Sequence, residues 1–128
     1  MKRAFRSLAA IVVTALAVAA APGCGRQQPA DPDQARATLV LALDAWRDGR
    51  TIDDVSGGSP SIVVADPSWK AGYKLSRYEV AEATGAAGFD RKIPVELWLE
   101  NPQGKPVREK VKYTVSVRPS RTVIRAPL

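Results

Sequence analysis

The sequence contains no histidine and only one cysteine, Cys24, among its 128 residues. Histidine is the commonest general base near neutral pH and the commonest metal ligand, so its absence argues against most acid–base and metal chemistries. A lone cysteine forms no disulfide within the chain. Residues 85–88 (Gly-Ala-Ala-Gly) lack the Lys-Ser/Thr pair of a phosphate-binding loop. We therefore predict no catalytic residue, no metal site and no cofactor.

The first 23 residues differ in composition from the rest of the chain. Three basic residues open it, residues 8–21 are apolar apart from Thr14, and Pro-Gly-Cys follows. This order is typical of a secretory signal peptide. The apolar run has about 14 residues, fewer than the roughly 20 that cross a bilayer as a helix. We expect residues 1–23 to be removed on export (the alternative is a retained membrane anchor), leaving a polar tether over residues 24–30 and a single domain over residues 31–128.

Ala21-Pro22-Gly23-Cys24 resembles the lipobox of bacterial lipoproteins. The resemblance implies that Cys24 becomes the new N-terminus, is acylated with fatty acids such as palmitate, and anchors the tether in a membrane. Leu is usual where Ala21 stands, and Pro22 is uncommon there. Gly25 implies sorting to the outer membrane where the cell has one; otherwise the protein is expected to be periplasmic or secreted. The alternative is an incidental cysteine inside a signal that is cut elsewhere.

Loss of the signal peptide lowers the net charge. The whole chain has 19 basic and 13 acidic residues, a net +6, and three of the basic ones lie in residues 1–23, so 16 minus 13 leaves +3. This excess is small, and we predict no nucleic-acid partner. From Lys105 to Arg125 there are seven basic residues and one acid, Glu109. Such a stripe suits anionic lipid headgroups or a cell-wall polymer; the alternative is a solvated face of a sheet.

The clearest predicted helix runs from Asp31 to Asp48. Asp31 can cap it, and Pro32 suits its first position. Its apolar residues recur at helical spacing: Ala35, Leu39, Ala42, Leu43 and Trp46. Gly49 is placed to end it. A second, shorter helical turn is expected over residues 51–55.

After Pro60 the apolar residues recur with a period of two, which indicates strands. Strands are predicted over residues 61–65, 73–83, 92–100, 107–118 and 121–125. The third and fourth form a hairpin with one apolar face around the turn at residues 101–104. A phase slip between Leu75 and Tyr78 predicts a β-bulge. Pro94 fits an edge or a bulge better than a central ladder position.

One helix followed by a meander of strands predicts an α+β domain. We expect the N-terminal amphipathic helix to pack on a bent antiparallel sheet of about four to five strands. This architecture resembles the small cystatin-like and NTF2-like folds, in which a bent sheet wraps an N-terminal helix. The resemblance covers residues 31–125 and rests on the order of the elements.

Few side chains remain as candidates for chemistry or for a pocket. The best acidic candidates are Asp53, Asp54 and Asp66, although helix caps and turns are the more usual roles of such residues. A pocket between helix and sheet would be lined by Trp46, Trp69 and Tyr73.

Trp98 stands apart because the alternation of its strand places it on the polar face. An exposed tryptophan can anchor a partner. We therefore predict a possible partner surface formed by Trp98, Lys110, Lys112 and Arg118. The alternative is that the stems of Lys110 or Lys112 pack against the ring and shield it.

These observations favour an exported, lipid-anchored cell-envelope protein that acts as a small non-enzymatic binding or structural module. Its expected partners are the membrane, through the anchor, and an envelope protein or polymer. The alternative is an NTF2-like small-molecule-binding protein or enzyme. A cystatin-like protease inhibitor is a third hypothesis, but it rests on analogy of fold alone.

Overall fold

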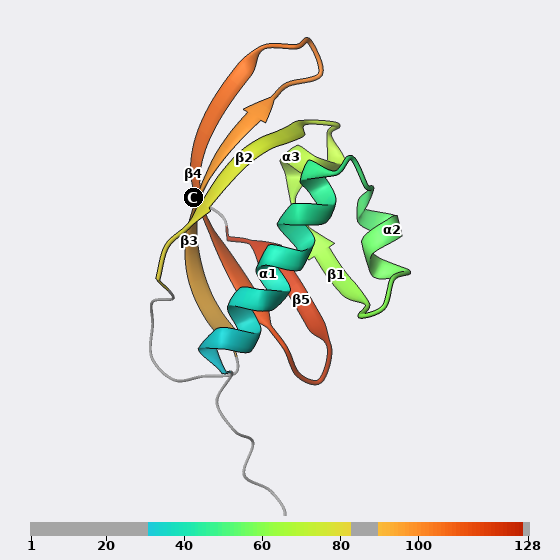
Figure 1. Cartoon of the computed structure of the whole chain (residues 1–128), viewed down its shortest axis with the longest axis vertical. Coiled ribbons are helices and arrows are strands. Elements are labelled where there is room, and N and C mark those ends of the chain that lie inside the picture. Colours follow the sequence, from blue (N-terminus) through green and yellow to red (C-terminus); the bar gives the residue numbers. More distant parts are fainter. Residues whose placement is uncertain (1–30, 83–89, 127–128) are drawn as a thin grey trace, which may run out of the picture.

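A computed structural model describes residues 31–82 and 90–126, and this part of the chain folds as an α+β domain (Figure 1). The predicted α+β class is confirmed. Its helices are α1 (Pro32–Arg47), α2 (Ile52–Ser56) and α3 (Pro67–Lys70). The predicted signal peptide, the tether and Cys24 lie outside the described residues. Within the described ranges no helix is both long and apolar enough to span a bilayer.

One curled, mixed sheet of five strands forms the scaffold, in the order β1-β5-β4-β3-β2. Its strands are β1 (Ile62–Ala65), β2 (Lys74–Val80), β3 (Asp90–Glu100), β4 (Pro106–Ser116) and β5 (Arg121–Arg125). Strands β2 to β5 pair antiparallel, but β1 pairs parallel with β5. The prediction of an antiparallel sheet is therefore wrong at this edge. The alternation of apolar and polar residues shows which face of a strand is buried, but it does not show in which direction the strand runs. No tight turn joins β1 to β5, so nothing local in the sequence indicates that they pair parallel.

The first helix, α1, is capped at both ends. Asp31 Oδ1 accepts a hydrogen bond from Asp33 N at 2.9 Å, which satisfies one of the free N–H groups of the first turn. At the other end Gly49 takes φ 85°, and Arg50 N donates to the carbonyl of Ala45 at 2.9 Å. This is the Schellman arrangement, in which a residue with positive φ turns the chain away from the helix axis.

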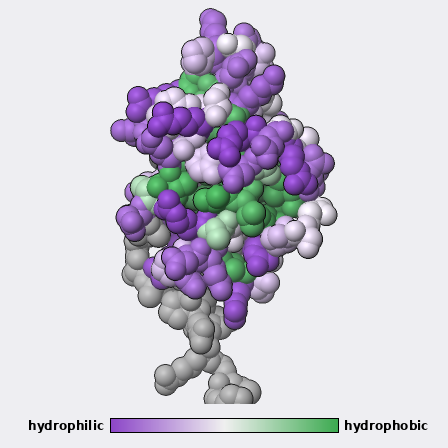
Figure 2. All heavy atoms as spheres, in the orientation of Figure 1, coloured by the Kyte–Doolittle hydropathy of each residue, from purple (hydrophilic) through white to green (hydrophobic). Residues whose placement is uncertain are grey.

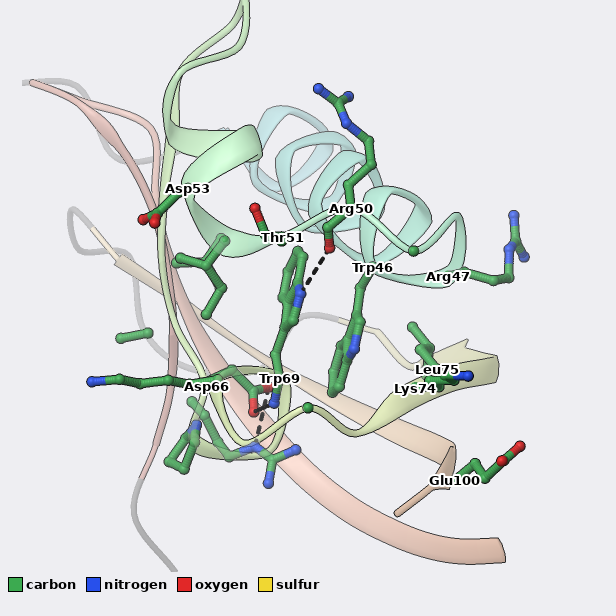
Figure 3. Close-up of a pocket in the computed structure, with 18 of the residues that line it drawn as sticks. Trp46, Arg47, Arg50, Thr51, Asp53, Asp66, Trp69, Lys74, Leu75 and Glu100 are labelled. Carbon is green, nitrogen blue, oxygen red and sulfur yellow. Dashed lines mark hydrogen bonds and ion pairs between the residues drawn. The ribbon is translucent and has the colours of Figure 1, made fainter. Parts of the chain in front are cut away.

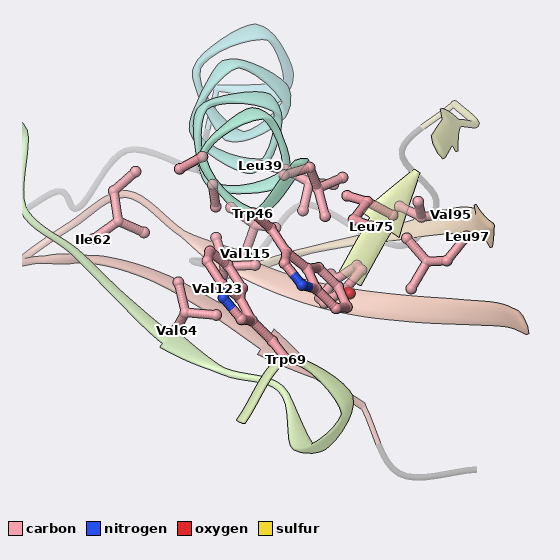
Figure 4. Packing of buried hydrophobic residues seen from close by; sticks show 14 of the residues in the cluster. Leu39, Trp46, Ile62, Val64, Trp69, Leu75, Val95, Leu97, Val115 and Val123 are labelled. Carbon is pink, nitrogen blue, oxygen red and sulfur yellow. The ribbon is translucent and has the colours of Figure 1, made fainter. Parts of the chain in front are cut away.

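Buried residues of α1 and of all five strands form one hydrophobic cluster (Figure 4). Its most buried large side chains are Leu39, Leu43, Ile62, Ile93, Leu97, Tyr113, Val115 and Val123. Two polar contacts tie α1 to the start and middle of β2. Trp46 Nε1 donates to Tyr73 O at 2.7 Å, and Tyr78 OH donates to Asp44 Oδ1 at 2.6 Å. Burial, together with this hydrogen bond, raises the pKa of Tyr78 to about 12.

Two irregular positions of the sheet agree with the sequence. The register of β2 against β3 shifts between Leu75 and Arg77, where the β-bulge was predicted. Pro94 lies one residue beyond the last β2–β3 pair, Val80 with Val95. Its carbonyl accepts a hydrogen bond from Ala81 N at 2.9 Å, so this residue faces the end of β2. The missing N–H of the proline therefore falls where the β2–β3 ladder ends and removes no hydrogen bond from its middle.

We predict that Gly49→Ala lowers the free energy of unfolding by about 1 kcal/mol, because alanine must then adopt a positive φ. Gly57→Ala is the matched control. Gly57 also follows a helix, but its φ is −86°, and a Cβ there would lie 3.4 Å from Asp53 O. The control should change stability by less than about 0.5 kcal/mol. Urea unfolding followed by tryptophan fluorescence measures both, and equal effects would contradict the role of Gly49.

Candidate functional site

A hollow of about 1280 Å³ lies beside the C-terminal end of α1 (Figure 3). The end of α1, the start of α2, β1 with α3, and the start of β2 all contribute to its lining. Figure 3 shows Trp46 and Trp69 side by side at its centre, with Asp53 on one side and Leu75 and Glu100 on the other. We call this hollow the tryptophan groove.

The two tryptophans form a stacked pair. Their ring centroids are 5.1 Å apart and their planes differ by 3°. Trp69 Nε1 donates to Arg50 O at 3.0 Å, and Trp46 Nε1 donates to Tyr73 O at 2.7 Å. Trp46 and Trp69 are 3% and 7% exposed, so they form the wall behind the groove rather than an open platform. The structure thus brings together Trp46 and Trp69 as predicted, whereas Tyr73 contributes a main-chain carbonyl and does not line the groove.

The rim of the groove carries charges of both signs. Arg50, Lys70 and Lys74 are exposed on it, and so are the acids Asp53 and Glu100. Lys74 and Glu100 are paired residues of β2 and β3. The rim therefore has a small basic excess around apolar walls, an arrangement suited to an amphipathic ligand with a negative group.

Asp66 is one of the lining residues of the groove but is only 3% exposed. It is the N-cap of α3: Oδ1 accepts from Ser68 N at 2.9 Å and from Trp69 N at 3.3 Å. Oδ2 accepts the hydroxyl of Tyr113 and lies 3.3 Å from Arg125 Nε. Both carboxylate oxygens are thus occupied, which leaves this acid little capacity to act on a ligand.

Arg125 extends the network to β4. Its Nη1 donates to Glu109 Oε2 at 2.8 Å and to Ser68 Oγ at 3.0 Å. Burial by itself would lower the pKa of Arg125, but the charge of Asp66 together with the smaller contributions of Tyr113 and Glu109 outweighs it, and the pKa is raised. Burial, and then the charge of Asp66, raises the pKa of Tyr113 well above its ordinary value. The network is therefore a neutral tyrosine and a cation held against a buried carboxylate.

The sequence singled out Asp66 but missed its partners, Tyr113 and Arg125. One signal was present: Glu109 is an acid on the apolar side of its strand, and such a residue needs a cation. The structure supplies that cation from β5, where Arg125 sits opposite Tyr113. Arg125 could be identified as this cation only from the pairing of the strands.

Asp54 shows the same use of an acid in a helix cap. Thr51 and Asp54 form a reciprocal capping box at the start of α2. Hydrogen bonds from Thr51 lower the pKa of Asp54. The capping roles considered for Asp54 and Asp66 are confirmed. Among the described residues, no group of three or more acidic, histidine or cysteine side chains is placed to hold a metal ion.

Trp98 lies on the opposite face of the sheet, covered by two arginines. The guanidinium carbons of Arg77 and Arg108 lie 4.5 and 5.0 Å from its ring centroid. Each arginine also pairs with an acid, Arg77 with Glu79 and Arg108 with Glu96. The shielding predicted for Lys110 or Lys112 is therefore made by Arg77 and Arg108 instead. The register explains this, because Arg108 is the residue directly opposite Trp98.

The predicted partner surface is spread along β4. Lys110 lies opposite Glu96, Lys112 opposite Pro94, and Arg118 falls in the β4–β5 turn beyond Ser116. The eight-residue step from Arg108 to Ser116 alone spans about 27 Å. Arg118 and Trp98 therefore do not share one compact patch.

No family model, no curated protein and no solved structure matches the chain. What the site can do follows from its own geometry. A groove with apolar walls and a charged rim can hold a ligand, and the buried network behind it holds the walls in place.

We predict that Arg125→Met lowers the free energy of unfolding by about 3 kcal/mol, because it leaves the Asp66 carboxylate buried without a cation. Arg47→Met is the control. Arg47 pairs with Asp44 at 3.0 Å, but the two side chains are 48% and 38% exposed, so the loss should stay below about 1 kcal/mol. Chemical denaturation measures both. A cost for Arg125→Met no larger than that of Arg47→Met would show that the network adds little to stability.

Proposed function

We propose that this protein is exported, is anchored in a cell-envelope membrane through acylated Cys24, and acts there as a small non-enzymatic binding or structural module. The observation that carries the proposal is the position of Cys24. It is the only cysteine of the chain and directly follows a basic, apolar leader with the composition of a signal peptide. Gly25 favours the outer membrane where the cell has one. The partner class is an envelope protein or polymer.

The use of the acidic side chains supports a non-enzymatic role. Asp54 is engaged in a capping box, and Asp66 in a cap, a tyrosine hydrogen bond and an ion pair. A general acid or base must reach a proton of the substrate, and Asp66 is 3% exposed. Of the three, Asp53 and Asp66 line the groove, but only Asp53 is exposed there.

We also propose kinship of this domain with the cystatin-like and NTF2-like folds. The order of its elements supports this, because α1 precedes a curled sheet whose strands β2 to β5 form a meander. The parallel strand β1 at the sheet edge is an addition to the pattern expected for these folds.

The anchor is tested with Cys24→Ser in a bacterial host, with Thr14→Ser as a control inside the leader. The wild type and the control should sediment with membranes, with an intact mass of residues 24–128 plus acyl chains. Cys24→Ser should lose the acyl mass, because it lacks the thiol that is acylated. Recovery of unmodified, full-length wild-type chain from the cytosol would overturn the proposal.

The second candidate function is small-molecule binding, and the tryptophan groove favours it. Its volume of about 1280 Å³ is ample for a small ligand. The groove opens at one end of the helix–sheet interface, while Leu39 and Leu43 are 0% and 1% exposed. A ligand would therefore lie beside Trp46 and Trp69 and not deep under α1.

The amphipathic anion anilinonaphthalene sulfonate serves as the probe for this groove. We expect saturable binding with quenching of tryptophan fluorescence. Lys70→Glu should weaken the affinity several-fold, because it reverses a charge on the rim. Lys112→Glu, at an exposed position of β4 opposite Pro94 that does not line the groove, is the matched control and should have no effect. Equal affinity in both variants would place the probe outside the groove and dispose of this candidate.

A further inference from the structure

We propose that one end of the domain, led by Arg118 and Arg121, rests on the anionic headgroups of the membrane that holds Cys24. This inference deepens the proposed function and depends on it, since only an anchored chain has a membrane beside it. The end in question, which we call the tether end, comprises the start of α1, the end of β2, the start of β3 and the β4–β5 turn at residues 117–120.

Several contacts place these elements together. Arg36, in the first turns of α1, donates through Nη1 to Ala81 O at 3.2 Å, just after β2. In the sheet, Asp90 at the start of β3 lies opposite Ser116 at the end of β4. Figure 1 accordingly shows the start of α1 and the β4–β5 turn at the same, lower end of the domain.

The β3–β4 turn lies at the opposite end. Strand β3 covers the 11 residues from Asp90 to Glu100, a length of about 34 Å at the rise of an antiparallel strand. Residues 101–104 follow at the top of Figure 1. The long axis of the domain thus separates the tether end from this turn.

The length of the tether decides which end meets the membrane. The described domain begins at Asp31, seven residues after Cys24. Seven residues span at most about 25 Å even when fully extended, which is less than the length of β3. An acylated Cys24 therefore keeps the tether end within about 25 Å of the bilayer, whereas the β3–β4 turn is free to lie farther away.

The β4–β5 turn has the charge that such a surface needs. Arg118 and Arg121 are exposed and flank Pro119-Ser120, with no acid between them. Acids are present elsewhere at this end: Asp31, Asp33, Glu82 and Asp90. Salt at 0.1 M screens exposed charges over about 10 Å, so the charges nearest the headgroups determine which part of this end faces the bilayer. We therefore infer that the β4–β5 turn faces the bilayer and the start of α1 does not. Figure 2 shows mainly hydrophilic side chains toward this end, which suits headgroups rather than the hydrocarbon core.

A weak attraction is enough, because the tether already supplies a high local concentration of membrane. For each arginine near an anionic surface, the ratio of domains in the contacting orientation to domains in other orientations rises about fivefold. The two arginines therefore select an orientation of an anchored domain, although they would not recruit an unanchored one.

The test uses the lipidated protein, purified from membranes and reconstituted into vesicles that contain phosphatidylglycerol or only zwitterionic phosphatidylcholine. Phenylglyoxal modification of arginines, read by peptide mass spectrometry, compares Arg118 and Arg121 with Arg50, which is exposed at the other end of α1. The reaction rates of Arg118 and Arg121 are each divided by the rate of Arg50. On anionic vesicles at about 0.1 M salt, both ratios should be about fivefold lower than on neutral vesicles. The difference should vanish at about 1 M salt.

Two variants locate the effect. Arg118→Ser should reduce the protection of Arg121 on anionic vesicles about fivefold, whereas Lys105→Ser, in the β3–β4 turn, should leave it unchanged. Equal reaction rates on both kinds of vesicle, or protection of Arg50 instead, would overturn the inference.

Intact mass separates this inference from the proposed function. If the protein carries no acyl chain, the proposed function fails, and the full chain is then coupled through Cys24 to a maleimide-bearing lipid for the same assay. Protection after coupling supports the orientation by itself, and its absence refutes it.

Discussion

The buried ion pair between Asp66 and Arg125 joins segments that are far apart in the sequence. Asp66 lies between β1 and α3 and caps α3, while Arg125 ends β5, and Tyr113 adds a hydroxyl from β4. Because Asp66 holds the N-H groups of Ser68 and Trp69, the same carboxylate sets the position of the ring that stacks on Trp46. The walls of the tryptophan groove therefore depend on one acid. A carboxylate left alone at this depth would be costly, so the cation and the cap are maintained together.

Several charged side chains of this protein form ion pairs with one another. On the outer face of the sheet, Arg77 and Arg108 enclose Trp98 and pair with Glu79 and Glu96. An aromatic side chain that the alternation leaves toward solvent is thereby covered by neighbouring strands. Other exposed basic residues lie on the rim of the groove, on β4 and in the β4–β5 turn. These are the places where an external anion can be attracted to the protein surface.

Most of the local structure could be predicted from the sequence, because caps, periodicity and turns are short-range signals. Asp31 and Gly49 mark the ends of α1, and the phase slip after Leu75 marks the bulge. The partnerships across the sheet could not be predicted in the same way. The parallel pairing of β1 with β5, the contact of Arg125 with Asp66, and the arginines over Trp98 all depend on which strands become neighbours. Of the candidate pocket, Trp46 and Trp69 were identified by composition and spacing, whereas the role of Tyr73 depends on a main-chain carbonyl that no side-chain pattern reveals.

The edge position of β1 also orders the events of folding. Ile62 pairs with Arg121, 59 residues later in the chain, whereas β2, β3 and β4 pair with strands that follow directly. A chain that emerges from its N-terminus first therefore presents the apolar segment Ile62–Ala65 long before its partner exists. Until residues 121–125 arrive, that segment is an unpaired strand available to other chains. Its shortness, with Pro60 before it and Pro67 after it, limits how far a foreign strand can extend along it.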